Sequence, residues 1–221
     1  MQSLASLLRL AYQTSKAVSR TGQQIREGLM AELVDEALGG VKLLRVRRFA
    51  DERGYFSETF NARAFEALGI TANFVQDNVS RSVKTGTVRG LHYQAPPHAQ
   101  AKLVRVIAGR IMDVAVDARK GSPTYGQHYA VELSAENDLQ LFVPAGFLHG
   151  FMTLQDDCLV HYKVDDFYSK ECDGAVRFDD PDLAIDWGLP ASRAVLSEKD
   201  KIAPLWADFQ SPFSHDGSGR P

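Results

Sequence analysis

The chain has few cysteines, no proline before Pro96 and no long hydrophobic run. Its two cysteines, Cys158 and Cys172, form no CxxC pair, so reduced thiols are expected in preference to a disulfide framework. No apolar segment approaches the roughly 20 residues that a transmembrane helix needs. The apolar residues at positions 1–10 are interrupted too soon by polar ones to form a signal peptide. These absences predict a cytoplasmic protein.

The charge is also unremarkable, because 25 basic and 28 acidic residues leave a net charge of -3. No global basic field is available to attract nucleic acid or an anionic membrane, so neither is expected as a partner. A phosphate-bearing small molecule would need a local group of cations. The content of 44% hydrophobic and 24% charged residues is ordinary for a globular protein. At 221 residues, one domain with a sizeable core is expected.

Residues 1–38 differ from the rest and are predicted to form a helical N-terminal arm. Apolar residues recur there at helical spacing, and Gly39 and Gly40 provide a helix stop. The recurring residues are Leu4, Leu7, Leu8 and Ala11, then Ile25, Leu29, Leu33 and Ala37. Three alternatives stay open: a disordered arm, a contact with a partner or a second subunit, and a natural start at Met30.

From Val41 onward the pattern changes to short strands, which favours an all-β sandwich or barrel over residues 41–205. A turn is predicted at 51–54, a short helix at 61–68 and a C-terminal tail at 206–221, with its Gly/Ser-rich end frayed. The predicted strands are 41–46, an aromatic-rich segment around 55–60, 73–79, 85–92, 102–108, 110–117, 128–133, 140–143, 149–153 and 158–164.

Two histidine motifs stand out, Arg89-Gly90-Leu91-His92-Tyr93-Gln94 and Pro144-Ala145-Gly146-Phe147-Leu148-His149. They are similar to the two halves of a metal site in small barrels of the cupin type. The second half is complete, but Gln94 occupies the position of a second histidine and Lys102 lies roughly where an acidic ligand is expected. A catalytic metal usually needs three protein ligands, and Lys102 would repel a cation. No metal is therefore expected.

The remaining groups are suited to proton chemistry on an anionic substrate. His92 could act as a general base, a role that imidazole often takes in enzymes, and Lys102 could stabilise an oxyanion. Tyr162 and Tyr168 could act as acids or stack on a flat ring. Each also has a structural alternative: a core histidine, a solvated lysine or aromatic packing. In a regular strand Arg89 and His92 face opposite sides, so a bulge, twist or strand end must bring them together.

Eight motifs in order make the chain resemble the dTDP-4-dehydrorhamnose 3,5-epimerase family, from about Val41 to about Leu205. The resemblance implies a cupin-type jelly-roll β-barrel with a few short helices and no metal or other cofactor. The motifs are Arg53-Gly54-Tyr55-Phe56-Ser57-Glu58, Phe74-Val75-Gln76-Asp77-Asn78, Val88-Arg89-Gly90-Leu91-His92-Tyr93-Gln94, Lys102-Leu103-Val104-Arg105, Asp113-Val114-Ala115-Val116-Asp117, Ser122-Pro123-Thr124-Tyr125-Gly126, Val143-Pro144-Ala145-Gly146-Phe147-Leu148-His149-Gly150-Phe151 and Tyr162-Lys163.

The resemblance also implies roles. His92 is the expected base, Asp180 the carboxylate that orients it, Lys102 the cation for the enolate and Tyr162 the acid on the opposite face. His149 is expected to line the same pocket. The residues expected to hold the nucleotide and its diphosphate are Arg53, Phe56, Glu58, Gln76, Asn78, Arg89 and Tyr168. Some of them are expected from a second subunit, because the family forms homodimers by exchanging strands.

The implied reaction is inversion of dTDP-4-dehydro-6-deoxy-D-glucose at C3 and C5 to dTDP-4-dehydro-L-rhamnose, a step of dTDP-L-rhamnose biosynthesis. The C4 ketone acidifies both positions, and one base, one acid and one cation suffice. Two alternatives remain: a single-centre epimerase or ketoisomerase of a related dTDP-deoxysugar, and a non-catalytic cupin that binds a sugar nucleotide.

Overall fold

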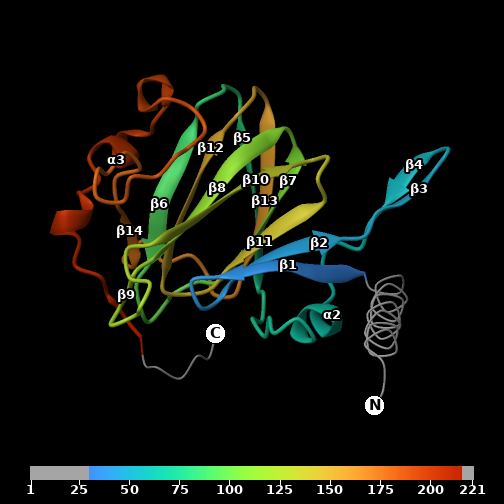
Figure 1. Cartoon of the computed structure of the whole chain (residues 1–221), viewed down its shortest axis with the longest axis horizontal. Helices are drawn as coiled ribbons and strands as arrows, with labels where there is room; N and C mark the ends of the chain where they lie inside the picture. The colour runs from blue at the N-terminus through green and yellow to red at the C-terminus, as the bar shows by residue number, and fades with distance from the viewer. Residues whose placement is uncertain (1–29, 216–221) are drawn as a thin grey trace, which may run out of the picture.

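Two antiparallel sheets face each other in a computed structural model that describes residues 30–215 (Figure 1). The six-stranded sheet has the order β1 (Ala31–Ala37), β2 (Val41–Val46), β11 (Leu139–Val143), β7 (Lys102–Ala108), β13 (Cys158–Val164) and β5 (Gln76–Ser82). The five-stranded sheet has the order β10 (His128–Ser134), β8 (Arg110–Asp117), β12 (Phe147–Thr153), β6 (Val88–Gln94) and β14 (Asp173–Ala175). The expected all-β, cupin-like jelly-roll fold is confirmed.

The remaining elements are short. A hairpin of β3 (Phe49–Asp51) and β4 (Gly54–Phe56) projects from one end of the barrel, and the helix α2 (Ala62–Glu66) follows it (Figure 1). The C-terminal third adds η1 (Ala191–Arg193), α3 (Glu198–Lys201) and η2 (Trp206–Asp208). A small parallel pair joins β9 (Arg119–Lys120) to β15 (Phe213–Ser214). Among the described residues, no helix has the length and apolar character to cross a membrane.

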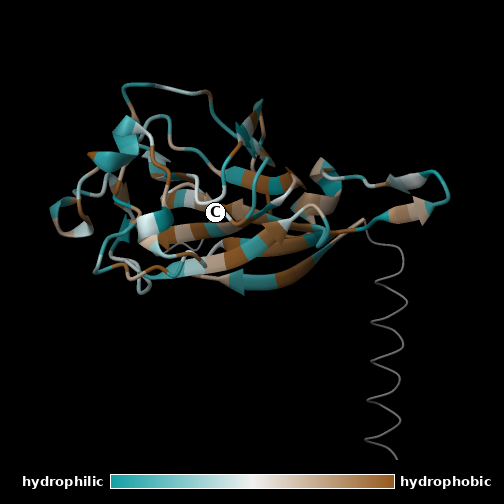
Figure 2. Ribbon diagram, turned by 90° about the horizontal axis from the view of Figure 1, so that it is seen from above, coloured by the Kyte–Doolittle hydropathy of each residue, from teal (hydrophilic) through white to brown (hydrophobic). Residues whose placement is uncertain are grey.

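Three apolar clusters explain why these segments stay together. One lies between the sheets and includes Val104, Ala115 and Phe151. A second packs the outer face of the five-stranded sheet against the C-terminal segment, and a third packs α2 against the six-stranded sheet. Strand β8 is buried along both faces, so its apolar run does not alternate with polar residues. Figure 2 shows hydrophobic residues concentrated on the strands and hydrophilic ones in most connecting loops.

The strand predictions from the sequence match closely. Segments 41–46, 102–108, 110–117 and 158–164 have the predicted ends, and the turn at 51–54 joins β3 to β4. These segments are rich in β-branched residues and are bounded by glycine, proline or charged residues, so local preference and tertiary environment agree. Strands β5 and β6 each begin and end about two or three residues later than predicted.

The prediction of helix up to residue 38 is wrong for residues 31–37, which form β1. This strand pairs with β2 antiparallel from Ala31 opposite Val46 to Ala37 opposite Val41. Edge pairing to the sheet satisfies the backbone of the segment, and that outweighs the helical spacing of Leu33 and Ala37. The folded domain therefore begins about ten residues before the predicted boundary at 41. The rest of the predicted arm, residues 1–29, lies outside the described residues.

The predicted tail at 206–221 is also part of the fold up to residue 215. Phe209 and Phe213 are buried in the cluster on the outer face of the five-stranded sheet, and Tyr93 packs edge-on against both rings. Backbone pairing of β15 with β9 fixes the end of this segment. The aromatic residues hold this part of the segment down. The Gly/Ser-rich end that was predicted to fray lies mostly outside the described residues.

Strand β6 contains the irregularity that the motif around His92 requires. His92 lies opposite His149, whereas Arg89 lies opposite Phe151, so three steps along β6 match two along β12. This bulge places Arg89 and His92 toward the same face. Gly90 has a φ of +137°, and a Cβ on it would lie 2.4 Å from Cα of Gly150. Only glycine fits where the two strands approach so closely.

Candidate active site

A cavity of about 180 Å³ opens between the two sheets and collects most of the predicted chemistry. The predicted residues that line it are His92, Lys102, Tyr162, Gln76, Asn78 and Tyr168. Tyr93, Gln94, Gln100 and Asp173, which were not predicted as site residues, line it as well. Residues separated by more than 90 positions in the chain thus meet in one polar pocket.

Strand register explains this convergence. In the six-stranded sheet Tyr162 lies opposite Asn78 on one side and Val104 on the other, so Lys102, two residues before Val104, shares its face. In the five-stranded sheet His92 lies opposite Ala175. His92 and the pair Lys102 and Tyr162 therefore approach the cavity from opposite sheets.

The carboxylate that contacts His92 is Asp200, and the prediction that Asp180 would do so is wrong. Nε2 of His92 lies 2.6 Å from Oδ1 of Asp200, across 108 positions of the chain. The Asp200 side chain is only 3% exposed. A buried carboxylate in this position fixes the orientation of the imidazole and stabilises its protonated form.

Asp180 has a structural role instead. Its Oδ1 accepts hydrogen bonds from the backbone N–H groups of Asp182 and Leu183, at 2.9 and 3.0 Å. Its Oδ2 accepts one from the backbone N–H of Trp206 at 2.7 Å. These bonds hold both oxygens in the turn that begins the C-terminal segment, and the carboxylate beside His92 is that of Asp200. Local composition marked Asp180 as a turn residue, and that reading is sufficient for it.

Asp200 is held by the helix on which it lies. Ser197 caps α3 by accepting from the backbone N–H of Asp200, and its hydroxyl donates to Oδ2 of Asp200 at 2.7 Å. Burial alone would raise the pKa of Asp200, but the hydrogen bonds to His92 and Ser197 outweigh it and hold that pKa below its usual range. Asp200 is therefore charged at neutral pH and faces His92 with its other oxygen.

Lys102 is a partly buried amine with an altered acidity. Burial lowers the pKa of Lys102 to about 8, although the carboxylates of Asp113 and Asp173 favour its charged form. Within residues 30–215 its ammonium group forms no hydrogen bond or ion pair. Because this cation is shielded from water and has no counter-ion among the described residues, it can interact strongly with a negative charge that develops on the substrate.

His149 lies deeper in the barrel than predicted and is not one of the residues that line the cavity. Its Nε2 lies 2.8 Å from Oδ1 of Asp113, and Asp113 is fully buried. The second oxygen of Asp113 has no hydrogen-bond partner among the described residues. The Asp113 carboxylate favours the charged form of Lys102, so Asp113 affects the cavity through the lysine.

Tyr162 is the phenol that faces His92 across the cavity. Burial raises its pKa, and the charge of Arg89 only partly opposes that rise. The phenol therefore keeps its proton at neutral pH and can donate it. Arg89 itself is exposed at the end of β6 and bonds Ser82 Oγ and the carbonyl of Arg81, at 3.2 and 3.1 Å.

Three predicted binding residues lie far from the cavity in this chain. Arg53 and Phe56 are on the projecting hairpin, at the opposite end of the molecule from α3 (Figure 1). Their exposure is high, with 84% for the Arg53 side chain and 65% for Phe56. Glu58 follows the hairpin, and its buried oxygen Oε1 has no hydrogen-bond partner within residues 30–215. One chain alone does not bring these residues to His92.

The donor set around the cavity does not form a metal site. Among the described residues, no three His, Cys, Asp or Glu side chains converge as ligands. Gln94, at the position of the missing histidine, directs its amide to backbone groups: Nε2 donates to the carbonyls of His98 and Phe167, and Oε1 accepts from Ser169. Both cysteines are free thiols.

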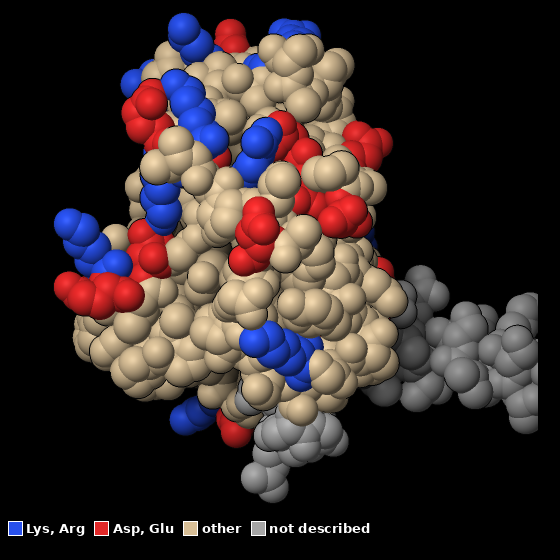
Figure 3. Space-filling model, turned by 90° about the vertical axis from the view of Figure 1, so that its left-hand side faces the viewer, with Lys and Arg blue, Asp and Glu red and all other residues tan. Residues whose placement is uncertain are grey.

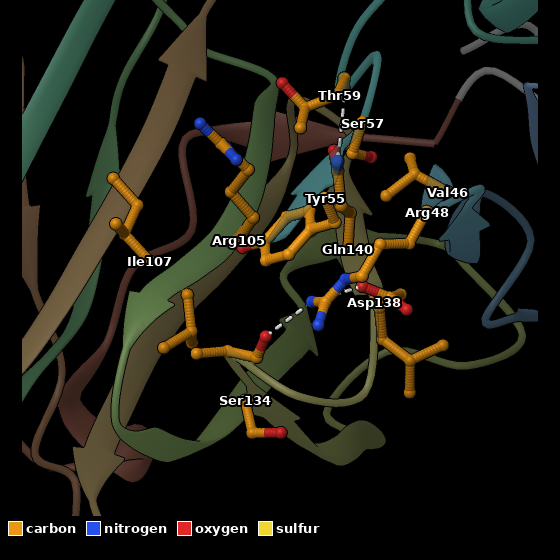
Figure 4. A pocket seen from close by; sticks show the side chains of 13 residues that line it. Val46, Arg48, Tyr55, Ser57, Thr59, Arg105, Ile107, Ser134, Asp138 and Gln140 are labelled. Carbon is orange, nitrogen blue, oxygen red and sulfur yellow. Dashed lines mark hydrogen bonds and ion pairs between the residues drawn. The ribbon is translucent and has the colours of Figure 1, made fainter. Parts of the chain in front are cut away.

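A second, smaller cavity of about 70 Å³ lies at the base of the hairpin (Figure 4). Arg48 lies beneath the ring of Tyr55 at 4.0 Å and pairs with Asp138 at 2.5 Å. Arg105 points toward it from β7. None of the residues predicted for the active site is among its lining residues, so we assign it no part in the chemistry.

The sequence missed Asp200, Asp113 and Asp173 as site residues. A signal for Asp200 was present in Ser197-Glu198-Lys199-Asp200, which has the spacing of a helix cap followed by an acid at its third position. That pattern predicts a short helix, but not that its aspartate lies beside His92. Asp113 lay inside an apolar strand, where a charged residue is a sign of function or of a buried pair.

Comparison with known proteins gives a consistent result. The sequence profile of dTDP-4-dehydrorhamnose 3,5-epimerase matches residues 35–208. The curated enzyme of that description from Sinorhizobium fredii is 49% identical over 179 residues, which cover 81% of this chain and 91% of that protein.

Solved structures agree with the sequence match. The epimerase of this description from Bacillus anthracis, with TDP and PPi bound, has a TM-score of 0.77 at 48% identity, covering 79% of this chain and 99% of that one. The Legionella pneumophila dTDP-6-deoxy-D-glucose-3,5-epimerase, in complex with dTDP-4-keto-L-rhamnose, has a TM-score of 0.79 at 43% identity and covers 84% and 98%. Together with the placement of His92, Lys102 and Tyr162 around one cavity, these matches show that the chain belongs to the dTDP-4-dehydrorhamnose 3,5-epimerase family.

Proposed function

We propose that the protein inverts dTDP-4-dehydro-6-deoxy-D-glucose at C3 and C5, giving dTDP-4-dehydro-L-rhamnose for dTDP-L-rhamnose biosynthesis. The observation that carries the proposal is the placement of His92 and Tyr162 on opposite sheets across one cavity, with Lys102 beside them. Inversion requires removal of a proton from one face of a carbon and delivery of a proton to the other. A base and an acid on facing sheets supply that geometry.

In the proposed mechanism His92 removes the proton from the carbon next to the ketone. Asp200 engages one ring nitrogen, so the other accepts the proton, and the carboxylate stabilises the resulting imidazolium. The electrons of the C–H bond move into the carbonyl and leave a negative charge on its oxygen. Lys102 stabilises that enolate, and Tyr162 then returns a proton from the opposite face. No change in oxidation state of the substrate is needed, so the proposed chemistry uses no cofactor.

The nucleotide is proposed to lie along β5 and the loop that follows β13. Gln76 and Asn78 line the cavity from β5, and Tyr168 offers an exposed ring at its edge. Arg89 is proposed to bind the diphosphate, since a guanidinium can bind phosphate oxygens bidentately. Figure 3 shows acidic and basic side chains interspersed on the face that carries α3. Individual cations, and not a broad basic field, are therefore proposed to hold the substrate.

A homodimer is proposed to complete the site. Strand β5 is the outer strand of the six-stranded sheet, and Val79 on it is 59% exposed. The hairpin of Arg53 and Phe56 projects without covering its own sheet (Figure 1). The exposed hairpin of one subunit could pair with the edge strand of a second subunit. The partner's hairpin would then bring its guanidinium and aromatic ring to the cavity. The proposed compartment is the cytoplasm, where the partly exposed thiol of Cys172 would stay reduced.

The decisive test is incubation with dTDP-4-dehydro-6-deoxy-D-glucose in deuterated water. Deuterium at both C3 and C5 supports the proposal, whereas deuterium at one centre would identify a single-centre epimerase. Binding of dTDP without exchange at either carbon would identify a non-catalytic binding protein. His92→Ala is expected to abolish exchange while dTDP still binds.

Mixed dimers test the exchange of hairpins between subunits. Arg53→Ala and His92→Ala homodimers should each be nearly inactive, for different reasons. After the two are mixed and allowed to re-associate, half of the dimers contain one intact site, so about a quarter of the wild-type activity should return. No recovery would mean that each chain builds its site from its own residues.

A further inference from the structure

Gln94 is the residue whose surroundings the proposed reaction leaves unexplained. It lies in the His92 motif, two residues beyond the proposed base, and its side chain is 5% exposed. A buried amide is costly unless its groups are bonded, because each unmet donor or acceptor loses its bonds to water. The bonds that Gln94 makes therefore indicate what it holds in place.

All of these bonds go to backbone groups, and two of them flank Tyr168. Oε1 accepts from the backbone N–H of Ser169 at 2.7 Å, and Nε2 donates to the carbonyl of Phe167 at 3.2 Å. Nε2 also donates to the carbonyl of His98 at 2.7 Å. A single side chain thus forms hydrogen bonds to the peptide groups on both sides of Tyr168.

A second glutamine, Gln76, also bonds the backbone of Tyr168. The backbone N–H of Tyr168 donates to Oε1 of Gln76 at 3.3 Å, and Nε2 of Gln76 donates to Asn78. The segment 165–172 between β13 and β14 belongs to no described strand, and its Cys172 carbonyl accepts from the backbone N–H of Ala95. Around Tyr168 the bonds to the backbone come from side chains in place of a strand ladder. The ring of Tyr168 is 59% exposed and receives little support from packing. Its hydroxyl donates one long hydrogen bond, to Oδ2 of Asp173 at 3.4 Å, and the two glutamines hold its backbone.

We infer that Gln94 is a positioning residue for nucleotide binding: it clamps the backbone around Tyr168 so that the exposed ring forms a preorganised wall for the flat base of the substrate. The inference rests on the proposed function, because it takes the ligand to be a dTDP-sugar. If so, two residues of the same strand serve different parts of the substrate. His92 acts on the sugar, and Gln94, on the same face two residues later, sets the nucleotide end of the pocket.

The expected effect follows from the entropy of the loop. Fixing the backbone of one residue costs roughly 1–2 kcal/mol, so a released Tyr168 must be ordered again when the base binds, and affinity should fall about tenfold. Inorganic pyrophosphate contains no base, so its binding should not change. The rate of deuterium exchange at saturating substrate should also be retained, since His92, Lys102 and Tyr162 keep their positions.

The experiment measures the affinities for dTDP and for pyrophosphate by calorimetry in Gln94→Met, Tyr168→Ala and the double variant. Gln94→Met keeps the volume and removes all three bonds. Gln94→Glu is the milder second variant, which keeps an acceptor for Ser169 and loses both donors. Asn137→Leu is the matched control, because Asn137 likewise holds three backbone groups of a turn, between β10 and β11, away from the cavity.

The inference is supported if Gln94→Met and Tyr168→Ala each weaken dTDP about tenfold, the double variant is no weaker than the single ones, and pyrophosphate binds as before. It is overturned if Gln94→Met binds dTDP like the wild type, or loses dTDP and pyrophosphate equally. Equal effects of Asn137→Leu and Gln94→Met on dTDP would also overturn it. Full dTDP affinity in Tyr168→Ala would refute the proposed nucleotide site itself, which separates that failure from the failure of the clamp.

Discussion

The rate of epimerisation should fall as the pH rises through about 8, because Lys102 then loses the proton that makes it useful. Burial lowers the pKa of this lysine to about 8, well below the ordinary value for an exposed amine. Only the protonated form stabilises the enolate oxygen. One pH unit above the pKa about a tenth of the lysines remain charged, so the rate at pH 9 should be about tenfold below its plateau.

The assay is the pH profile of kcat/KM for deuterium exchange, which reports the ionisations of the unbound enzyme. Two variants assign the decline to Lys102. Lys102→Arg keeps a charge at all accessible pH values, so its profile should stay flat beyond pH 8 even though its rate is lower. Lys102→Met should lose about 100- to 1,000-fold at every pH, the usual cost of removing one oxyanion-stabilising group.

Ionisation of Tyr162 does not account for a decline near pH 8, because burial raises the pKa of Tyr162 and so moves it away from that of Lys102. A wild-type pH profile that is flat to pH 10 would refute the lowered pKa of Lys102. A decline near pH 8 that persists in Lys102→Arg would show that another group is responsible.

Three further predictions use the aspartates. Asp200→Asn should lower the exchange rate by about 100- to 10,000-fold, because His92 loses the carboxylate that stabilises its protonated form. Asp180→Asn should leave the exchange rate near normal but lower the free energy of unfolding by about 1–3 kcal/mol, because the hydrogen bond from the backbone N–H of Trp206 is lost. Kinetics and urea denaturation measure the two effects. A large loss of rate with unchanged stability would restore Asp180 as the partner of His92. Asp113→Asn should move the basic limb of the pH profile to lower pH, because Asp113 favours the charged form of Lys102; an unchanged limb would remove that influence.

Much of the fold was available in the sequence. Strands such as 102–108 and 110–117 are rich in β-branched residues and end at turns, so local preference already agrees with the final environment. The error at residues 31–37 came from a spacing that suits a helix as well as an edge strand. Only the neighbouring strand β2 decided between them, because it supplies the backbone partners.

Much of the site was available as well, in the form of residue types and spacing. The motifs around His92, Lys102 and Tyr162 are short and lie on predicted strands, so their membership of one pocket followed from a resemblance between ordered motifs. The bulge that lets Arg89 and His92 share a face was foreseen as a requirement, and the pairing with β12 provides it.

What the sequence by itself determined is most of the strands after residue 40, the family, and the placement of His92, Lys102 and Tyr162 in one cavity. Those depend on local preference and on motifs that are read over a few positions. The tertiary structure alone decided which carboxylate meets His92 and what Gln94 holds. Asp200 reaches His92 across 108 positions, and Gln94 grips a loop more than 70 positions away. Such contacts are set by where distant segments pack, and no short-range pattern records them.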